Sequence, residues 1–230
     1  MQVDPFEDVP MDEYGNKNKE KDIHDEYKRI IGNAIAQSWT VANQKAWVIV
    51  EPLDPVTFYE QPVDEKGFYA FKVSGIVQGR ADRYFYVLCD HQTCTRGQWD
   101  KDDVLDDMEQ YETYHSDEGK ITVVCSTIKS PVPRLVAHRR LFGVRWAEFV
   151  KEHNRYTIVF QTCQHPTIRC PEDGRVDANA LIRADIDLLD SPGQCSLTLT
   201  VRINLSGNAF GLGFLGESLQ GATQTASQTV

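Results

Sequence analysis

The chain has 230 residues, of which 41% are hydrophobic, enough for one sizeable core. Its formal net charge of -10 makes nucleic acid a poor candidate partner, because phosphate binding needs clustered lysine and arginine. No apolar run approaches the roughly 20 residues of a membrane-spanning helix, and the polar N-terminal stretch lacks the apolar centre of a secretory signal. We therefore expect a cytoplasmic protein whose six cysteines are reduced thiols.

The N-terminal part predicts an arm followed by a helix. Residues 1–22 carry many charges and few bulky apolar side chains, which is typical of a disordered arm, and this arm is a candidate site for a protein partner. From residue 24 to residue 43, apolar side chains recur at three- and four-residue spacing, which predicts an amphipathic helix with one core-facing stripe. The stripe consists of Tyr27, Ile30, Ile31, Ala34, Ile35 and Trp39.

Three short strands and a second helix are predicted next. The strands cover residues 46–52, 56–63 and 67–79, with Pro55 and the turn DEKG between them. The segment ADRYFYVLCD, residues 81–90, places Tyr84, Val87 and Leu88 on one side of a helix of about three turns.

The second half predicts long antiparallel strands. Residues 106–128 and 139–165 each read as two strands joined by a turn, at SDEG and at HNR. Residues 180–189 and 195–205 alternate apolar and polar side chains, so each strand should bury one face and expose the other, including Arg183 and Asp185, to water. Such strands make a large curved sheet, and its concave side has to be filled.

Four motifs occur in an informative order. They are RADRYFYVLCDHQTCTRGQWD (80–100), KSPVPRLVAHRRLFGVRW (129–146), HPTIRCPEDGRVDANALIR (165–183) and VRINLSG (201–207). Together they resemble the START domain, the lipid-transfer domain related to steroidogenic acute regulatory protein, within the helix-grip superfamily. Two positions depart from the family pattern, since Arg140 stands where an aspartate is usual and Asn204 where an aspartate is common.

The resemblance, over about residues 24–220, implies an α+β helix-grip fold. A long curved antiparallel sheet would follow an N-terminal helix, with short helices after the third strand and a C-terminal helix over the cavity. A single domain would span residues 23–222, between the arm 1–22 and a flexible tail, 223–230. The glycines at 211, 213 and 216 each cost a helix about 1 kcal/mol relative to alanine, so we expect a short or weak C-terminal helix.

The resemblance also implies a set of site residues. A buried arginine, Arg139, would face an acid on the preceding hairpin, either Glu109 or Glu112. These two lie three apart on a strand and hence on opposite faces, and Glu112 is preferred because it shares its face with Met108 and Tyr114. An exposed cross-strand ion pair is the alternative.

The remaining candidates are apolar. Cavity-wall candidates are Phe142, Trp146, Leu199 and Val201, although Trp146 also fits ordinary core packing. Candidates for an entrance loop that touches membrane are Pro131, Val132, Pro133, Leu135 and Val136, with a stiff connector as the alternative. Candidates for the C-terminal lid are Phe210, Leu212, Phe214 and Leu215.

Two cysteine-rich stretches raise the question of zinc. CDHQTC (89–94) and CQHPTIRC (163–170) each place a histidine two residues after a cysteine. Their spacings differ from the CxxC pairs of zinc ribbons and fingers, and Cys89 falls within the apolar helix pattern. We expect structural thiols, no metal site, and no cofactor other than a bound lipid.

The resemblance implies a non-enzymatic carrier or sensor. It would enclose one sterol or phospholipid in an apolar cavity and exchange it during transient contact with membranes. Two alternatives stay open. One is a lipid-responsive interaction module without transfer, in which side chains fill the cavity, and the other is a helix-grip enzyme of the cyclase or hydrolase type. The histidines fall mostly at turns or ends and no nucleophile elbow occurs, so catalysis is not the preferred interpretation.

Overall fold

The computed structural model describes residues 17–62, 64, 66–89, 105–115, 119–129, 137–164, 174–191 and 193–205. Its elements are α1 (Lys17–Ala42), β1 (Val48–Leu53), β2 (Val56–Gln61), β3 (Tyr69–Gln78), α2 (Ala81–Cys89), β4 (Leu105–His115), β5 (Lys120–Ile128), β6 (Arg139–Val150), the 3-10 turn η1 (Lys151–His153), β7 (Arg155–Thr162), β8 (Val176–Asp177), β9 (Asn179–Leu188) and β10 (Gln194–Asn204).

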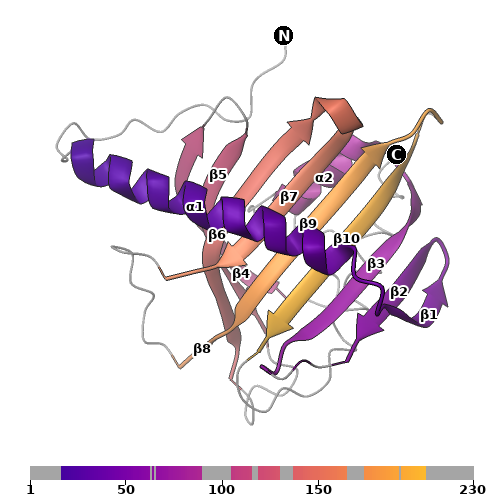
Figure 1. Ribbon diagram of the computed structural model, residues 1–230, viewed down its shortest axis with the longest axis horizontal. Coiled ribbons are helices and arrows are strands. Elements are labelled where there is room, and N and C mark those ends of the chain that lie inside the picture. The colour runs from indigo at the N-terminus through magenta and orange to yellow at the C-terminus, as the bar shows by residue number, and fades with distance from the viewer. Residues whose placement is uncertain are drawn as a thin grey trace.

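The strands form one curled sheet. Its order is β1-β2-β3-β10-β9-β7-β6-β5-β4, with antiparallel neighbours throughout, and β8 pairs with β6 in parallel. Figure 1 shows the sheet bent into a half-barrel, with α1 crossing one face and α2 lying behind the other. The predicted N-terminal helix and long curved antiparallel sheet are thereby confirmed. The predicted C-terminal helix falls in 206–230, outside the described residues.

The predicted strand pairs are also present. β4–β5 and β6–β7 are the two predicted hairpins, and the three short strands β1, β2 and β3 also pair, as a meander. The β6–β7 turn ends on Asn154, whose φ of 49° lies in the left-handed region that asparagine tolerates better than most residues.

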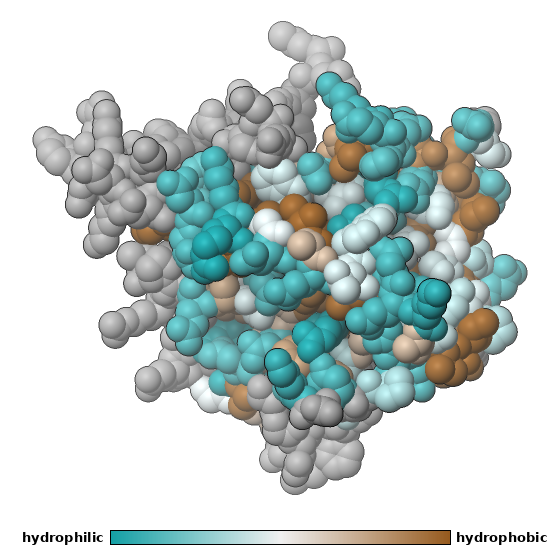
Figure 2. All heavy atoms as spheres, in the orientation of Figure 1, coloured by the Kyte–Doolittle hydropathy of each residue, from teal (hydrophilic) through white to brown (hydrophobic). Residues whose placement is uncertain are grey.

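The face of the sheet under α1, here the outer face, is closed by one stripe of the helix. Tyr27, Ile31 and Ala34 are buried and pack against strand residues that include Val144 and Val159. The helix crosses β6, β7, β9 and β10, so it covers the middle of the sheet. Figure 2 views this face and shows mainly hydrophilic residues along the helix, with hydrophobic residues gathered near the border where Figure 1 places β1.

The stripe differs from the predicted one at its end. Trp39 is 52% exposed, whereas Ser38 is buried and donates a hydrogen bond to the Ile35 carbonyl. The prediction for Trp39 was wrong because a small residue lets the helix approach the sheet, while the indole lies beside the contact and packs on the Arg183 guanidinium, 5.3 Å from the ring centroid.

The helix also begins earlier than predicted. It starts at Lys17, so residues 17–22, placed by the sequence in the arm, belong to its first turns. The segment KNKEKD is rich in lysine and glutamate, which have good intrinsic helix propensity, and it extends a helix that the apolar stripe further along already stabilises.

The alternation predicted for β9 is wrong at two positions. Arg183 and Asp185 are buried, with exposures of 7% and 6%. Their face does not meet water because α1 covers it. The alternation of apolar and polar residues therefore assigns the residues of β9 to its two faces correctly, but it does not predict which face is exposed to water.

The opposite face, here the inner face, holds the other core clusters. In sheet order, side chains from β3, β10, β9, β7, β6 and β5 pack together with those of α2. This helix lies over β7, β9 and β10. Figure 1 shows the sheet curling away from α1 toward the side of α2, so the inner face is its concave side. No helix in the described ranges is long and apolar enough to cross a bilayer.

Candidate functional site

The inner face offers a broad apolar surface. Its buried members on the strands include Phe71, Val124, Ile128, Leu141, Ile158, Phe160, Ala180, Ala184, Leu199, Val201 and Ile203. Above them, α2 contributes Phe85, Leu88 and Cys89. The cavity-wall candidates Leu199 and Val201 thus lie on the inner face, and their role as cavity wall stays a prediction.

A positively charged residue interrupts this apolar surface. Arg145 is only 7% exposed, and its backbone pairs with Thr122 on β5 and with Phe160 on β7. Leu141 stands four residues earlier on β6 and belongs to the inner cluster. Since alternate residues of a strand point to the same face, Arg145 also lies on the inner face. A guanidinium on a concave apolar surface is a donor for a polar group, and Thr122 places a buried hydroxyl beside it.

The pKa shift of Cys89, at the end of α2, agrees with the position of Arg145 on the inner face. Burial raises the pKa of the Cys89 thiol, while the nearby positive charges of Arg145 and Lys120 act in the opposite direction. The end of α2 therefore faces these two cations across the inner face, and the thiol stays neutral at neutral pH. Cys89 packs with the inner cluster, as its place in the apolar helix pattern predicted.

Sequence reasoning did not identify Arg145 as a site residue. The choice of Phe142 and Trp146 as cavity-wall candidates assigned the cavity to the face of β6 opposite to Arg145. The signal was nonetheless available, since an arginine stands in the middle of a strand whose neighbours on both sides, Val144 and Trp146, are apolar. Such a strand is covered on both faces, and a charge within it needs a partner or a ligand.

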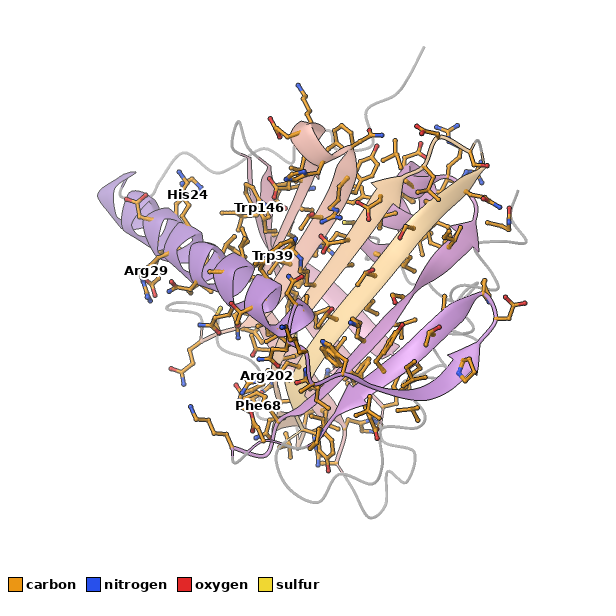
Figure 3. The ribbon with its side chains drawn as sticks, turned by 45° about the vertical axis from the view of Figure 1, so that its right-hand side comes forward. His24, Arg29, Trp39, Phe68, Trp146 and Arg202 are labelled. Carbon is orange, nitrogen blue, oxygen red and sulfur yellow. The ribbon has the colours of Figure 1, made fainter. Side chains whose placement is uncertain are left out.

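The structure corrects the placement of Phe142 and Trp146. Both lie on the outer face of β6, buried at 8% and 6%, in the cluster formed with Tyr27, Ile31 and Ala34. Figure 3 shows Trp146 on the side of α1. They are core packing beneath the helix and do not line the concave side. The prediction failed because both faces of β6 are apolar.

Arg139 is buried, as expected, but its described contacts are with backbone. Its guanidinium donates hydrogen bonds to the carbonyls of Leu205 and Ala137. These bonds tie the start of β6 to the end of β10. The predicted acidic partners have side chains outside the described part of the structure, so the pairing of Arg139 with an acid stays a prediction.

The register of β4 changes the reasoning about that partner. Glu109 pairs with Cys125 and Glu112 with Val123, with a register shift between Gln110 and Glu112. The shift is a β-bulge, which adds one residue to β4 and breaks the strict alternation of faces. The premise that residues three apart occupy opposite faces therefore does not apply to this pair.

The other predicted residues fall outside the described ranges. These are the gate-loop residues Pro131, Val132, Pro133, Leu135 and Val136, and the lid residues Phe210, Leu212, Phe214 and Leu215. Residues 90–94 of the first cysteine-rich stretch are likewise outside. In the second, burial raises the pKa of the Cys163 thiol to about 11.

Comparison with solved structures places the fold. The human StAR-related lipid transfer protein 5 superposes with a TM-score of 0.66 at 17% identity, covering 86% of this chain and 97% of that chain. Human STARD10 gives 0.67 at 14% identity, covering 85% and 78%. A STAR-related lipid transfer protein from Xanthomonas axonopodis gives 0.56 at 15% identity, covering 80% and 98%.

No protein-family model and no curated protein matches the chain. At these identities the likeness concerns the fold alone. The chain has the helix-grip fold of the StAR-related lipid transfer structures, which confirms the fold class predicted from the sequence.

Proposed function

We propose that this protein encloses one lipid molecule, a sterol or a phospholipid, against the inner face of its sheet and exchanges it at cytoplasmic membrane surfaces. The observation that carries the proposal is the buried Arg145 on a concave apolar surface roofed by α2. The similarity of the fold to lipid transfer structures supports the same interpretation.

The energetics of such a site divide between two parts of the ligand. Acyl or ring surface that leaves water for the inner face gains about 25 cal/mol per Å². A hydroxyl or phosphate oxygen that accepts a hydrogen bond from Arg145 offsets part of the cost of burying a guanidinium. The apolar surface therefore supplies affinity, and Arg145 sets the position of the polar end.

Exchange requires that the site open. We place the opening at the end of the sheet where β6 begins and β10 ends, which Arg139 holds together through the Leu205 carbonyl. The gate loop, 130–136, and the chain that follows Leu205 both start from this end. In this proposal these two segments supply the entrance loop and the lid that the resemblance implies. In this proposal the protein binds and transfers lipid without chemical change.

A vesicle assay tests the proposal. The purified full chain is incubated with donor vesicles that contain a fluorescent sterol or phosphatidylcholine and with unlabelled acceptor vesicles, and transfer is followed with time. Leu199→Trp adds bulk on the inner face, and Ser196→Trp adds the same bulk on the outer face of the same strand, where Ile76 beside it is exposed.

The two variants separate the proposal from a general effect of added tryptophan. We expect transfer above the protein-free rate, at least a tenfold loss for Leu199→Trp, and a near-normal rate for Ser196→Trp. Absence of transfer and of lipid binding by the unmodified chain, or equal rates for both variants, would refute the proposal and leave the interaction-module alternative.

A further inference from the structure

A hollow lies on the outer face, on the side of the sheet opposite to the proposed lipid site. It has a volume of about 440 Å³ and is bounded by the C-terminal part of α1, by β2, β3, β9 and β10, and by the β2–β3 connection. Ala70 precedes Phe71 on β3, and Arg202 follows Val201 on β10. Because Phe71 and Val201 belong to the inner face, the pocket residues Ala70 and Arg202 point to the outer face. The sheet therefore separates the two spaces. A pocket of this size accommodates a small molecule.

The apolar part of the pocket is built from both layers. Ala70 and Leu181 contribute from the outer face of the sheet, Val41 from α1, and Phe68 from the segment before β3. Ala70 and Leu181 are buried, at 7% and 5% exposure, so this wall is fixed by the fold. It favours a ligand with one apolar group.

The charged part of the pocket is already neutralised. Arg202 and Asp64 form an ion pair with Nη2 and Oδ2 2.5 Å apart, and the guanidinium lies 4.0 Å from the centroid of the Phe68 ring. Asp64 also accepts hydrogen bonds from the backbone amides of Lys66 and Phe68, which together with Arg202 lower its pKa. Figure 3 shows Arg202 and Phe68 together below the C-terminal end of α1.

This arrangement selects against charged ligands. An anion that approached Arg202 would meet the Asp64 carboxylate, and a cation that approached Asp64 would meet the guanidinium. Either ligand would have to displace the ion pair between Arg202 and Asp64, whose carboxylate accepts three hydrogen bonds. A neutral ligand meets no such competition.

Amide groups supply the remaining polar surface. Gln37 lines the pocket from α1, Gln44 from the segment that follows the helix, and Gln61 from the end of β2. The Nε2 atom of Gln61 is buried and has no hydrogen-bond partner among the described residues. A buried amide N–H without an acceptor is costly, and a ligand carbonyl reached by a small rotation of this side chain would satisfy it.

We propose that the outer-face pocket binds a neutral small molecule that carries a carbonyl group of the amide type next to an apolar group. The apolar group lies on Ala70 and Leu181, and the carbonyl accepts a hydrogen bond from Gln61. Arg202 of this pocket follows Val201 of the inner face directly on β10, so the two faces share this strand.

Nuclear magnetic resonance titration of the full chain tests this site with matched probes. Benzamide carries the neutral amide, benzoate carries the same ring with a carboxylate, and benzylamine carries it with a cation. We expect benzamide to bind in the millimolar range and to shift the side-chain amide of Gln61 and the backbone amides of Ala70, Leu181 and Arg202. We expect benzoate and benzylamine to bind at least fivefold more weakly.

Three variants locate the binding. Gln61→Leu removes the hydrogen-bond donor and should weaken the affinity for benzamide about fivefold. Ala70→Leu fills the pocket and should abolish the chemical-shift changes that benzamide causes. Gln78→Leu, an exposed glutamine at the far end of β3, is the matched control and should change nothing. Absent shifts, shifts confined to the inner face, equal binding of the three probes, or equal losses in Gln61→Leu and Gln78→Leu would overturn the proposal. Since Gln61→Leu lies at the end of a strand, its result stands even where Ala70→Leu fails to fold.

Discussion

Arg183 and Asp185 form an ion pair inside the protein, with Nε and Oδ2 2.7 Å apart and side-chain exposures of 8% and 9%. The two residues stand two apart on β9, on the outer face under α1. Thr157 on the neighbouring strand donates a further hydrogen bond of 2.9 Å to Asp185. The pair thus links two central strands and, through the ring of Trp39, the helix that covers them.

Breaking this pair should cost far more than replacing it. We expect Asp185→Leu to lower the free energy of unfolding by about 3–5 kcal/mol, because it leaves the Arg183 guanidinium buried without its partner. The double variant Arg183→Met with Asp185→Leu should recover most of that loss, since neither charge is then buried. Urea denaturation of the three proteins measures both effects.

A neighbouring ion pair, which joins β7 to β9, provides the control. Arg155 and Asp187 lie 2.5 Å apart, but their side chains are 24% and 27% exposed, so Asp187→Leu should cost only about 1 kcal/mol. A similar cost for Asp185→Leu and Asp187→Leu, or a double variant no more stable than Asp185→Leu, would show that burial does not govern the first pair.

Two glycines should respond in opposite directions to alanine. A Cβ added at Gly143 would lie 2.1 Å from the Gln161 carbonyl oxygen, where β6 and β7 approach closely, so Gly143→Ala should destabilise by about 1–3 kcal/mol. Gly32 lies in α1 with nothing within 4 Å of such a Cβ, so Gly32→Ala should stabilise by up to about 1 kcal/mol. Thermal unfolding of both variants tests the pair, and a shift of the same sign in both would contradict it.

Stability should fall in alkaline solution through Tyr84. Its hydroxyl donates a 2.7 Å hydrogen bond to the Gln78 carbonyl, and burial raises its pKa to about 12. In the unfolded chain a tyrosine ionises near pH 10, so unfolding releases a proton above that pH. The contribution of Tyr84 is therefore fully present below about pH 10 and is lost as the pH rises toward 12.

The variant Tyr84→Phe isolates this effect. It should be less stable at neutral pH, because the hydrogen bond to Gln78 is gone, but its stability should decline less than that of the unmodified protein between pH 10 and pH 12. Urea unfolding at several pH values in that window measures the difference. Parallel declines in the two proteins would show that Tyr84 does not carry the effect.

Arg145 should control which lipid is bound. Arg145→Met keeps the length of the side chain and removes the charge, so we expect it to weaken binding of a polar-headed lipid by at least tenfold and to leave the apolar contacts intact. Arg145→Lys retains a charge and should recover part of the binding. Fluorescent-lipid titrations of the three proteins test this, and unchanged affinity in Arg145→Met would remove Arg145 from the site.

The fold was predictable because its signals are local. The stripe from Tyr27 to Ala34, the turns at SDEG and HNR, and the alternation of β10 each follow from a few neighbouring residues. The order of elements then resembled a known family, and the sheet topology agrees with it.

The site was less predictable because it depends on which face of a strand becomes the inside. On β6 the first eight residues are all buried, so hydrophobicity does not distinguish the side of Arg145 from that of Trp146. On β4 a bulge after Gln110 changes the alternation that was used to choose between Glu109 and Glu112. Both facts depend on the packing of α1 and on the pairing of distant strands, which a single sequence does not encode in its local pattern.

Mass spectrometry of the organic extract of the natively purified chain tests the central claim most directly. We predict about one lipid per protein in the unmodified chain and in Ser196→Trp, and a large loss of that lipid in Leu199→Trp. An extract with no lipid near equimolar amounts, or the same lipid content in Leu199→Trp, would contradict a guest bound against the inner face.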